Sequence, residues 1–264
     1  MTAGIVIFAI NNELVDYVSM AAWSAKRIRH FLNLPTTIVT DNPVDNKNFD
    51  QVIVVDKDTG NRKFYHEYNK VSNWYNTSRP SVYDLSPYDQ TLVIDADYVV
   101  NSQQLSKLFN SDRDFLCHRL AYDVTESTTD SWLNQFGKFK WPMAWATAMY
   151  FKKSLYSRSV FDVMTMVKDN WQHYRNLYQI SNQLYRNDFA LAIALNIVNG
   201  HSGNFTAIPW PLITLVSDYK LKLIEHNKFC LEYNQSQNRK YLFLADQDFH
   251  CLDKLQLGEI IEHS

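Results

Sequence analysis

The first sixty residues alternate short apolar runs with one amphipathic segment. The apolar run at 4–10 predicts a buried strand, and apolar residues recur at helical spacing from Val15 to Leu32. We expect Asn11-Asn12 to cap this helix, Glu13 to lie in its first turn and Pro35 to end it. Apolar runs at 36–40 and 51–55 predict two more strands. Strand, helix, strand and strand in this order indicate an α/β fold with a mostly parallel central sheet flanked by helices.

The rest of the chain continues with helical and strand-like segments. Residues at helical spacing predict a helix over 64–83, which Pro80 bends or ends. The apolar run at 91–100 predicts the central strand. Further expectations are a short helix at 103–109, a strand at 114–124, a polar loop at 125–140, a strand at 146–151, helices at 155–178 and 187–198, and strand-like or loop-like segments at 205–216 and 241–254.

Composition is that of an ordinary globular protein. The 264 residues, 46% hydrophobic and 20% charged, suffice for a full core, and we expect one domain over 1–264. The formal net charge of −2 means that a nucleic-acid partner would need a local basic patch. Cys117, Cys230 and Cys251 lack CxxC spacing, which argues against a zinc site or a disulfide framework. Without a signal-peptide pattern or an apolar run of about 18 residues, we expect a cytoplasmic protein with no membrane anchor.

The segment TLVIDADYVV at 91–100 carries the most informative chemistry. Asp95 and Asp97 follow an apolar run that reads as a buried strand, and such a strand has no structural use for two carboxylates at its carboxyl end. In open α/β sheets, ligands bind outside this end of the strands. We therefore expect a divalent cation there, holding a substrate that bears phosphate. The chain contains neither GxGxxG nor GxxxxGK[ST], so the phosphate charge must be met without a glycine-rich loop.

The Asp-x-Asp spacing suits this task, because side chains two apart on a strand project to the same side. One carboxylate can bind a hard cation directly, and the other directly or through water. On its own the triplet is a weak signal that arises by chance in many chains of this length. Its apolar flanks strengthen it, since no Lys or Arg in the same strand is available to pair with the acids.

Several motifs in a fixed order resemble a known family. These are IVIFAINNE, Thr40-Asp41, TLVIDADYVV, WATAMYFKKS, RNDFALAIAL and DFHCLDK, which together span nearly the whole chain. The chain resembles nucleotide-sugar glycosyltransferases of the GT-A fold, in particular phage-encoded glycosyltransferase-like proteins with a glycogenin-like layout. The resemblance implies a nucleoside-diphosphate sugar donor, with UDP-sugar favoured, and Mn²⁺ or Mg²⁺ as cofactor. It also implies a nucleotide-sugar-binding half at 1–100 and an acceptor-binding half at 101–264.

The resemblance also implies roles for individual residues. Asp95, Asp97 and His250 would bind the metal, and Lys254 would reach the diphosphate. Asp188 would bind the acceptor or act as catalytic base. The other expected donor contacts are Ala9, Ile10, Asn11, Thr40, Asp41, Arg79 and Ala96. The spacing around His250 and Lys254 is shorter than in glycogenin and lacks its Gly and Pro-Trp, so these two roles depart most from the family pattern.

Each of these residues also has a purely structural interpretation. His250 could be a partly buried histidine with one backbone hydrogen bond, Lys254 and Arg79 solvated surface residues, and Asp188 a helix-start acid. Aromatic residues near these positions fit core packing as well as stacking on a base or sugar. They are Trp74, Tyr75 and Tyr83 before the central strand, and Trp132, Phe136 and Trp141 in a loop that could cover the acceptor side.

The acceptor is left open by the sequence. The phage-type resemblance implies a hydroxymethylated pyrimidine base in DNA, which would have to leave the helix stack. The overall acidity favours a saccharide or protein acceptor, and short basic groups such as 26–29, 138–140 and 152–153 are usually solvated faces. Two other classes compete with a transferase. A sugar-nucleotide pyrophosphorylase normally begins with a glycine-rich loop bearing Arg and Lys, which is missing here, and a non-catalytic sugar-nucleotide-binding relative is disfavoured by retention of both acids. Stereochemistry and oligomeric state stay open.

Overall fold

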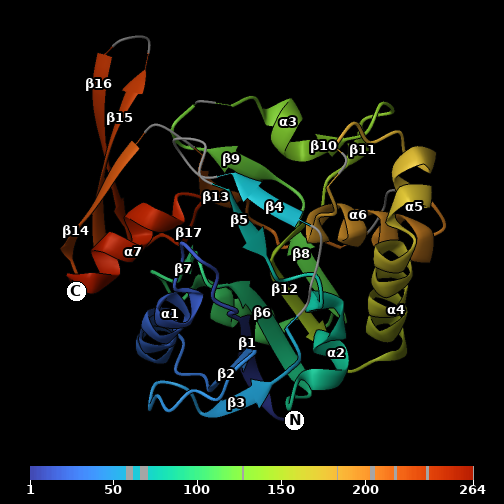
Figure 1. Ribbon diagram of the computed structural model, residues 1–264, viewed down its shortest axis with the longest axis horizontal. Coiled ribbons are helices and arrows are strands. Elements are labelled where there is room, and N and C mark those ends of the chain that lie inside the picture. Colours follow the sequence, from blue (N-terminus) through green and yellow to red (C-terminus); the bar gives the residue numbers. More distant parts are fainter. Residues whose placement is uncertain are drawn as a thin grey trace.

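A six-stranded sheet forms the centre of the computed structural model (Figure 1), which describes residues 1–57, 62–65, 71–126, 128–182, 184–202, 206–216, 219–235 and 238–263. Its strand order is β3-β2-β1-β6-β12-β8. The first four strands in this order run parallel, and β12 runs antiparallel to both of its neighbours. The strands are β1 (Ala3–Phe8), β2 (Thr36–Thr40), β3 (Gln51–Val54), β6 (Gln90–Asp95), β8 (Phe115–His118) and β12 (Trp145–Lys152). The predicted α/β fold with a mostly parallel central sheet is confirmed.

Strands β1 and β6 place the chemistry of the site. They pair in parallel, so that Ile5 lies beside Leu92 and Phe8 lies beside Asp95. Side chains in the middle of both strands are fully buried, as the continuous apolar runs require of a sheet covered on both faces. Asp95 is the last residue of β6 and lies on the wall of a cavity. The core therefore fixes the position of the first acid.

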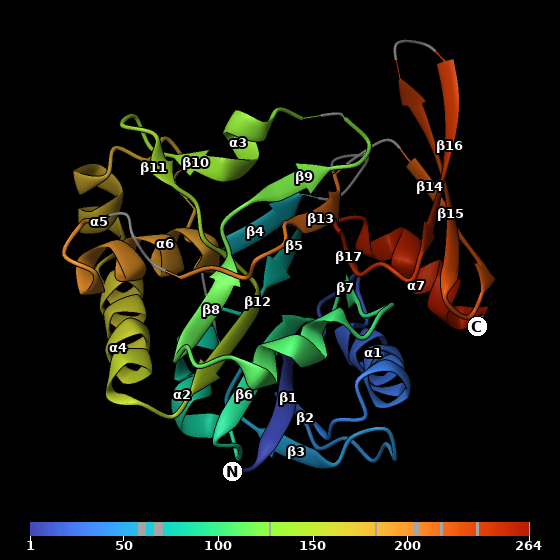
Figure 2. The ribbon, with the colours of Figure 1, turned by 180° about the vertical axis from the view of Figure 1, so that it is seen from behind.

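A second sheet crosses the carboxyl end of the central one (Figures 1 and 2). Its strand order is β7-β17-β13-β9, and it contains segments far apart in the sequence. The strands are β7 (Tyr98–Val99), β9 (Ala121–Asp123), β13 (Leu212–Leu215) and β17 (Phe249–Cys251). His250 on β17 lies beside Tyr98 on β7. This pairing brings a late segment of the chain to the turn that follows β6.

A three-stranded antiparallel sheet projects from the body beside α7 (Lys254–Glu262), as both views show. It consists of β14 (Tyr219–Glu225), β15 (Lys228–Gln235) and β16 (Asn238–Ala245), in that order. Phe229, Leu231 and Leu244 on its inner face are buried, and Phe229 contacts Phe249 of β17 with 5.1 Å between ring centroids. The sheet is thus anchored to the body by one apolar face.

Helices cover the central sheet. The main ones are α1 (Tyr17–Phe31), which packs on β2, and α4 (Leu155–Asp169) and α6 (Asn187–Val198), which pack on each other, with α6 also on β12. The shorter ones are α2 (Val82–Leu85), α3 (Asp130–Asn134) and α5 (Trp171–Leu177), with 3-10 helices at Arg79–Ser81 and Gln104–Asn110. In the part of the chain described, no helix is both long and apolar enough to cross a bilayer.

The expected cap of the first helix is wrong. Asp16 caps α1, because its side chain accepts a hydrogen bond from the Ser19 amide at 2.9 Å. Asn12 instead accepts from the amides of Leu14 and Val15 in the preceding turn, and Glu13 bonds Asn73. The helix therefore begins several residues later than the polar pair indicated.

The helix predicted over 64–83 is also wrong. Within the described part of this range the chain forms the hairpin strands β4 (Arg62–Tyr65) and β5 (Val71–Trp74), the 3-10 turn and α2, while 66–70 lie outside the described residues. Pro80 can occupy only the first turn of a helix, so it starts the helical stretch instead of bending a longer one.

Other predicted segments differ from the observed elements in where they end or divide. The predicted strand 114–124 divides into β8 and β9, which belong to different sheets, and the predicted loop 125–140 contains α3 and one strand of the small hairpin β10 (Gln135–Phe136) and β11 (Trp141–Pro142). The predicted helix 155–178 breaks at Asn170, whose ψ of 35° leaves the helical region. The segment 241–254 ends in a helix start, and the pairing of β14 with β15 was missed.

Candidate metal and anion site

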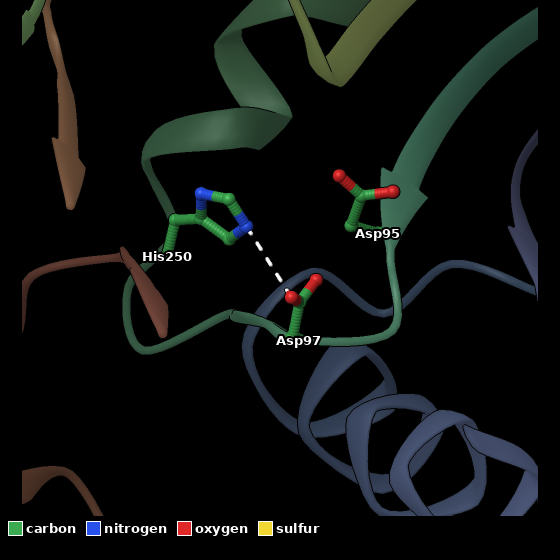
Figure 3. A group of neighbouring side chains, drawn as sticks. All are labelled: Asp95, Asp97 and His250. Carbon is green, nitrogen blue, oxygen red and sulfur yellow. Dashed lines mark ion pairs between the residues drawn. The ribbon is translucent and has the colours of Figure 1, made fainter. Parts of the chain in front are cut away.

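Asp95, Asp97 and His250 converge above the carboxyl end of β6 (Figure 3). Asp95 ends the strand and Asp97 lies in the turn that leads to β7. The carbonyl of Asp97 accepts a hydrogen bond from the amide of Cys251 at 3.0 Å, which ties this turn to β17. The His250 ring points toward the Asp97 carboxylate, with 3.4 Å between Nε2 and Oδ2. Local chain turns and strand pairing thus bring the three predicted metal ligands together.

The three side chains fit a divalent cation. One ligand atom from each lies within 4.8 Å of the others. Ligand atoms around Mg²⁺ or Mn²⁺ at roughly 2.1–2.2 Å are separated by about 3 to 4.4 Å, so contraction of a few tenths of an ångström would complete the set. Two carboxylate oxygens and one imidazole nitrogen form a donor set that suits Mn²⁺ and accommodates Mg²⁺.

Each acid also has its own cationic partner. Arg79 donates from Nη1 to Oδ1 of Asp95, and Lys254 Nζ lies 2.6 Å from Oδ2 of Asp97. Arg79 is 2% exposed and Lys254 9%, which is rare for these residue types unless they are paired. Both residues were predicted to contact the donor phosphates. The surface interpretation of Arg79 and Lys254 is therefore wrong.

The position of Lys254 breaks a rule of helix electrostatics. It is the first residue of α7, after the N-cap Asp253, and a positive charge at a helix N-terminus opposes the helix dipole. Its pairing with the buried Asp97 offsets this cost. Residues that violate local preferences tend to mark functional or strained positions. The placement points to a role at the site instead of a role in the helix.

The two acids differ in how the protein controls their charge. Burial raises the pKa of Asp95 even though the Arg79 guanidinium opposes it. Burial also acts to raise the pKa of Asp97, but the Lys254 ammonium and His250 outweigh it and hold this pKa well below its usual range. Burial acts to lower the pKa of Lys254, and Asp97 reverses this and raises it. Asp97 and Lys254 therefore stabilise each other in the charged form.

Arg79 keeps unused donors inside the protein. Its Nε and Nη2 atoms are buried and have no hydrogen-bond partner among the described residues. An unpaired buried donor costs roughly 1–3 kcal/mol, and more for a charged group. Since Arg79 lines the cavity described next, the unused side of its guanidinium is available to a bound anion or hydroxyl.

A cavity of about 390 Å³ opens beside these residues. Its volume is in the range of pockets that hold small organic ligands. Predicted site residues on its wall are Ile10, Arg79, Asp95, Ala96, Asp97, Asp188, His250 and Lys254; the remaining wall residues include Phe8, Tyr17, Trp74, Tyr75, Asn76, Trp132, Trp145, Ala146, Thr147, Arg186, Asn187, Val216, Tyr219, Leu252, Asp253 and Leu255.

The other expected nucleoside contacts lie at the ends of β1 and β2 but are not among the cavity-lining residues described. Ala9 is buried after β1, and the Asn11 side chain donates to Asp16 at 2.9 Å. Thr40 ends β2 with a buried hydroxyl that has no partner in the described part of the chain. Asp41 pairs with Lys57 at 3.6 Å, and Lys57 Nζ lies 4.1 Å from the Tyr75 ring centroid. Tyr75 connects this group to the cavity wall.

Asp188 is engaged on both oxygens. Oδ1 accepts from the Ala146 amide at 2.9 Å, and Oδ2 accepts from Nη2 of Arg186 at 2.7 Å. It lies in the first turn of α6, as an acid that favours the helix dipole. The carboxylate thus links α6 to β12 at the cavity wall. Its partners favour a positioning role in this state of the protein.

The aromatic residues divide into two groups. Trp74, Tyr75 and Trp132 line the cavity, and Trp132 is 55% exposed. Tyr83 instead stacks on Phe151 in the core, while Phe136 and Trp141 pack against Tyr178. For these last three residues the packing interpretation holds.

Some residues of the wall carried no separate signal in the sequence. Arg186 and Asn187 directly precede the predicted Asp188 and could have been included with it. Asn76 lies close to the predicted Arg79, and its amide oxygen is buried without a partner in the described chain. Trp145 reaches the wall through pairing of β12 with β8, and Tyr219 through hydrogen bonds to Cys251 and Asp253; a single sequence does not reveal these long-range contacts.

No protein-family model and no curated protein matches the chain. Solved structures that match it include the apo form of glycosyltransferase GlyE from Streptococcus pneumoniae TIGR4, at 11% identity, with 78% of this chain covered and a TM-score of 0.41. Two structures of LgtC also match, each over 73% of this chain. An active-site mutant is 11% identical, is covered over 69% of its own length and has a TM-score of 0.47. The galactosyltransferase in complex with donor and acceptor sugar analogs is 12% identical, is covered over 70% of its own length and has a TM-score of 0.43. The chain spans 45% of the length of GlyE.

Proposed function

We propose that the chain is a metal-dependent glycosyltransferase of the GT-A class, which transfers a sugar from a nucleoside-diphosphate sugar to an acceptor hydroxyl. The observation that carries the proposal is the group Asp95, Asp97 and His250 on the wall of a cavity, with the buried cations Arg79 and Lys254 beside it. Packing of the hydrophobic core does not require five ionisable side chains at one end of a strand.

The charge balance of the site fits a diphosphate. The two acids and the two paired cations cancel, so a divalent ion would leave the site with an excess of positive charge. When bound by Asp95, Asp97 and His250, Mn²⁺ or Mg²⁺ would supply Lewis-acid stabilisation of the charge on the leaving diphosphate. Lys254 and the unused donors of Arg79 would meet the remaining phosphate charge through hydrogen bonds.

The donor would extend from this corner toward the ends of β1 and β2. Ile10 lines the cavity, and Ala9, Asn11, Thr40 and Asp41 lie at or just after the ends of β1 and β2; we propose that they surround the nucleoside, with UDP as the favoured carrier. The Tyr75 ring and Lys57 lie between the two regions. Support comes from this continuity along one sheet edge, where α/β proteins bind their ligands.

On the acceptor side we propose that Asp188 orients the incoming hydroxyl or takes its proton once Arg186 moves aside. As acceptor we propose a hydroxymethylated pyrimidine base in DNA; the aromatic side chains Trp74 and Trp132 on the wall support it, because a base outside the helix stack needs such stacking partners. The experiment described next also tests the two alternative acceptors, a saccharide and a protein hydroxyl.

The test is a binding and turnover screen. UDP and UDP-sugars, each with Mn²⁺, Mg²⁺ or EDTA, are assayed by thermal shift, and the best pair is incubated with hydroxymethylated DNA, oligosaccharides or peptides before mass spectrometry. We expect a metal-dependent rise in Tm and a hexose or pentose mass added to one acceptor. Release of pyrophosphate from a sugar phosphate and a nucleoside triphosphate would instead identify a pyrophosphorylase. Donor binding without turnover on any acceptor would identify a non-catalytic relative.

The test variant is Asp95→Asn, and its matched control is Asp112→Asn. The Asp112 side chain is 89% exposed and lies outside the cavity wall as described. Loss of the metal-dependent shift in the first variant alone assigns the effect to the site. An equal shift in both variants would contradict the proposal.

A further inference from the structure

The projecting sheet β14–β15–β16 has a second face that the fold does not use. Its inner face is buried against the body, while side chains in the alternate positions point outward. We call the outward side chains Lys220, Lys222, Cys230, Glu232, Tyr241 and Phe243 the outer face.

The outer face carries two aromatic rings that are more than half exposed to solvent. Tyr241 is 58% exposed and Phe243 56%. They are two residues apart on β16, so their rings stand on the same side about 7 Å apart. Exposed aromatic side chains that cluster in this way mark interaction surfaces more often than random surface does.

Cations lie in the same rows as the rings. Strand register places Lys220, Glu232 and Tyr241 in one row, and Lys222, Cys230 and Phe243 in the next. Each lysine is therefore about 10 Å across the sheet from a ring, two strand spacings away. In addition, Lys228 Nζ lies 5.0 Å from the Phe243 ring centroid.

The charge of this sheet is opposite to that of the whole chain. Residues 219–245 carry five cations, Lys220, Lys222, Lys228, Arg239 and Lys240, against Glu225 and Glu232, while the chain as a whole has a formal net charge of −2. One of the two acids, Glu232, is already paired with Arg239 at 3.1 Å. The sheet is a local basic patch on an acidic protein, and a polyanion is its complementary partner.

We propose that the outer face binds single-stranded nucleic acid. Bases would stack on Tyr241 and Phe243, and Lys220 and Lys222 would contact the backbone phosphates. Rings and cations on one open sheet face are the combination that recognises single strands without sequence preference. An anionic polysaccharide would use the lysines but gains less from two neighbouring rings. The binding needs neither metal nor sugar nucleotide, so the inference stands apart from the proposed transfer.

The test is fluorescence anisotropy with a labelled oligothymidine of about twelve nucleotides, at low salt and with EDTA present. We expect each of Tyr241→Ser and Phe243→Ser to weaken binding at least about fivefold, the lower bound for loss of one stacked base. Lys220→Gln with Lys222→Gln should lower the slope of log Kd against log salt by about 1.4, for two lost phosphate contacts.

The matched control is Phe139→Ser. Phe139 is 61% exposed and stands between Lys138 and Lys140, in the turn between β10 and β11. This variant should bind as the wild type does, and all variants should keep the wild-type Tm. The proposal is overturned if the oligonucleotide does not bind, if Phe139→Ser weakens binding as much, or if heparin binds as tightly with the same dependence on the rings.

A dimer that covers the outer face would also overturn the proposal, and sedimentation velocity would reveal it as a species that Tyr241→Ser dissociates. The assay separates this inference from the proposed transferase. Loss of oligonucleotide binding with metal-dependent donor binding intact removes only the sheet assignment, and the reverse result removes only the transferase.

Discussion

Lys254 Nζ lies 2.6 Å from Asp97 Oδ2, so one of the three predicted metal ligands is already neutralised by a lysine at the start of α7. Arg79 holds Asp95 in the same way. A divalent ion held by the two acids would therefore compete with the Arg79 guanidinium and the Lys254 ammonium, and these two cations would then be available to the phosphates of the proposed donor. This competition connects the stability of the site to its chemistry, and the predictions for Asp97 and Arg79 depend on it.

Asp97→Asn should abolish metal-dependent turnover and leave the fold intact but less stable. A neutral amide is a poor ligand for a hard cation, and Lys254 loses its buried partner, which costs about 3–5 kcal/mol. Urea unfolding and isothermal titration with Mn²⁺ measure the two effects. The double variant Asp97→Asn with Lys254→Met should regain most of the stability and still bind no Mn²⁺. Recovery of Mn²⁺ binding in the double variant would contradict the assignment of Asp97 as a ligand.

Arg79→Lys should weaken sugar-nucleotide binding about tenfold or more, because the lysine keeps the charge but loses the planar donors Nε and Nη2. Mn²⁺ alone should bind as well as before or better, since a weaker competitor faces Asp95. Calorimetry with each ligand separately checks both statements. Arg158→Lys, at a surface pair with Asp84, serves as control and should change neither affinity. Equal loss of metal and donor affinity would indicate a purely structural role for Arg79.

Stability should rise with pH between about 4 and 6.5 because of His118. Burial lowers the pKa of this histidine from its ordinary 6.5 to about 4, and its Nδ1 lies 3.0 Å from the Trp210 carbonyl. The unfolded chain takes up a proton in this range and the folded chain does not, so the stabilisation is complete above the unfolded pKa and is lost as pH falls toward 4. The effect is on the order of 3 kcal/mol.

The measurement is urea unfolding across that pH range, compared with His118→Asn. The amide of asparagine can still donate to Trp210 but does not titrate, so this variant should lack the histidine part of the slope. Carboxylates contribute to both proteins equally and cancel in the difference. Parallel curves for the two proteins would show that His118 titrates normally when folded.

Trp132→Ala should impair acceptor use and spare donor hydrolysis. The ring lines the cavity and is 55% exposed, so it offers an open stacking face without supporting the core. We expect the acceptor KM to rise between about twofold and tenfold, as for loss of one aromatic contact. Steady-state kinetics with and without acceptor make the distinction. Phe139→Ala, an exposed ring outside the described cavity wall, should leave both rates unchanged.

The elements that the sequence predicted are those with a strong local pattern. The second strand and helix α6 match their predicted ranges, whereas the strand predicted over 91–100 ends as β6 at Asp95, and its last residues form β7 of another sheet. In these segments burial on both faces or a continuous helical stripe determines the structure, so the local sequence contains the information. The divided helix at Asn170 and the misassigned helix over 64–83 show the limit, because a few residues at helical spacing also occur in hairpins and turns.

The site was predicted in part for the same reason. Asp95 and Asp97 are separated by one residue and could be read from the sequence, and the roles of His250 and Lys254 came from the resemblance. The partners could not be read: that Arg79 meets Asp95 and Lys254 meets Asp97 depends on where a 3-10 turn and the start of α7 lie in space. Such pairings between distant segments arise from tertiary packing.

The antiparallel pairing of β17 with β7 has a consequence for shortened forms of this protein. A protease cut or stop codon before residue 249 would spare the central sheet and both aspartates, yet remove the imidazole and the ammonium that complete their surroundings. Such a fragment would be expected to retain β-rich circular dichroism while leaving two carboxylates with no countercharge from α7. Antibodies or tags that report the intact C-terminal helix would then distinguish competent molecules from folded but inert ones.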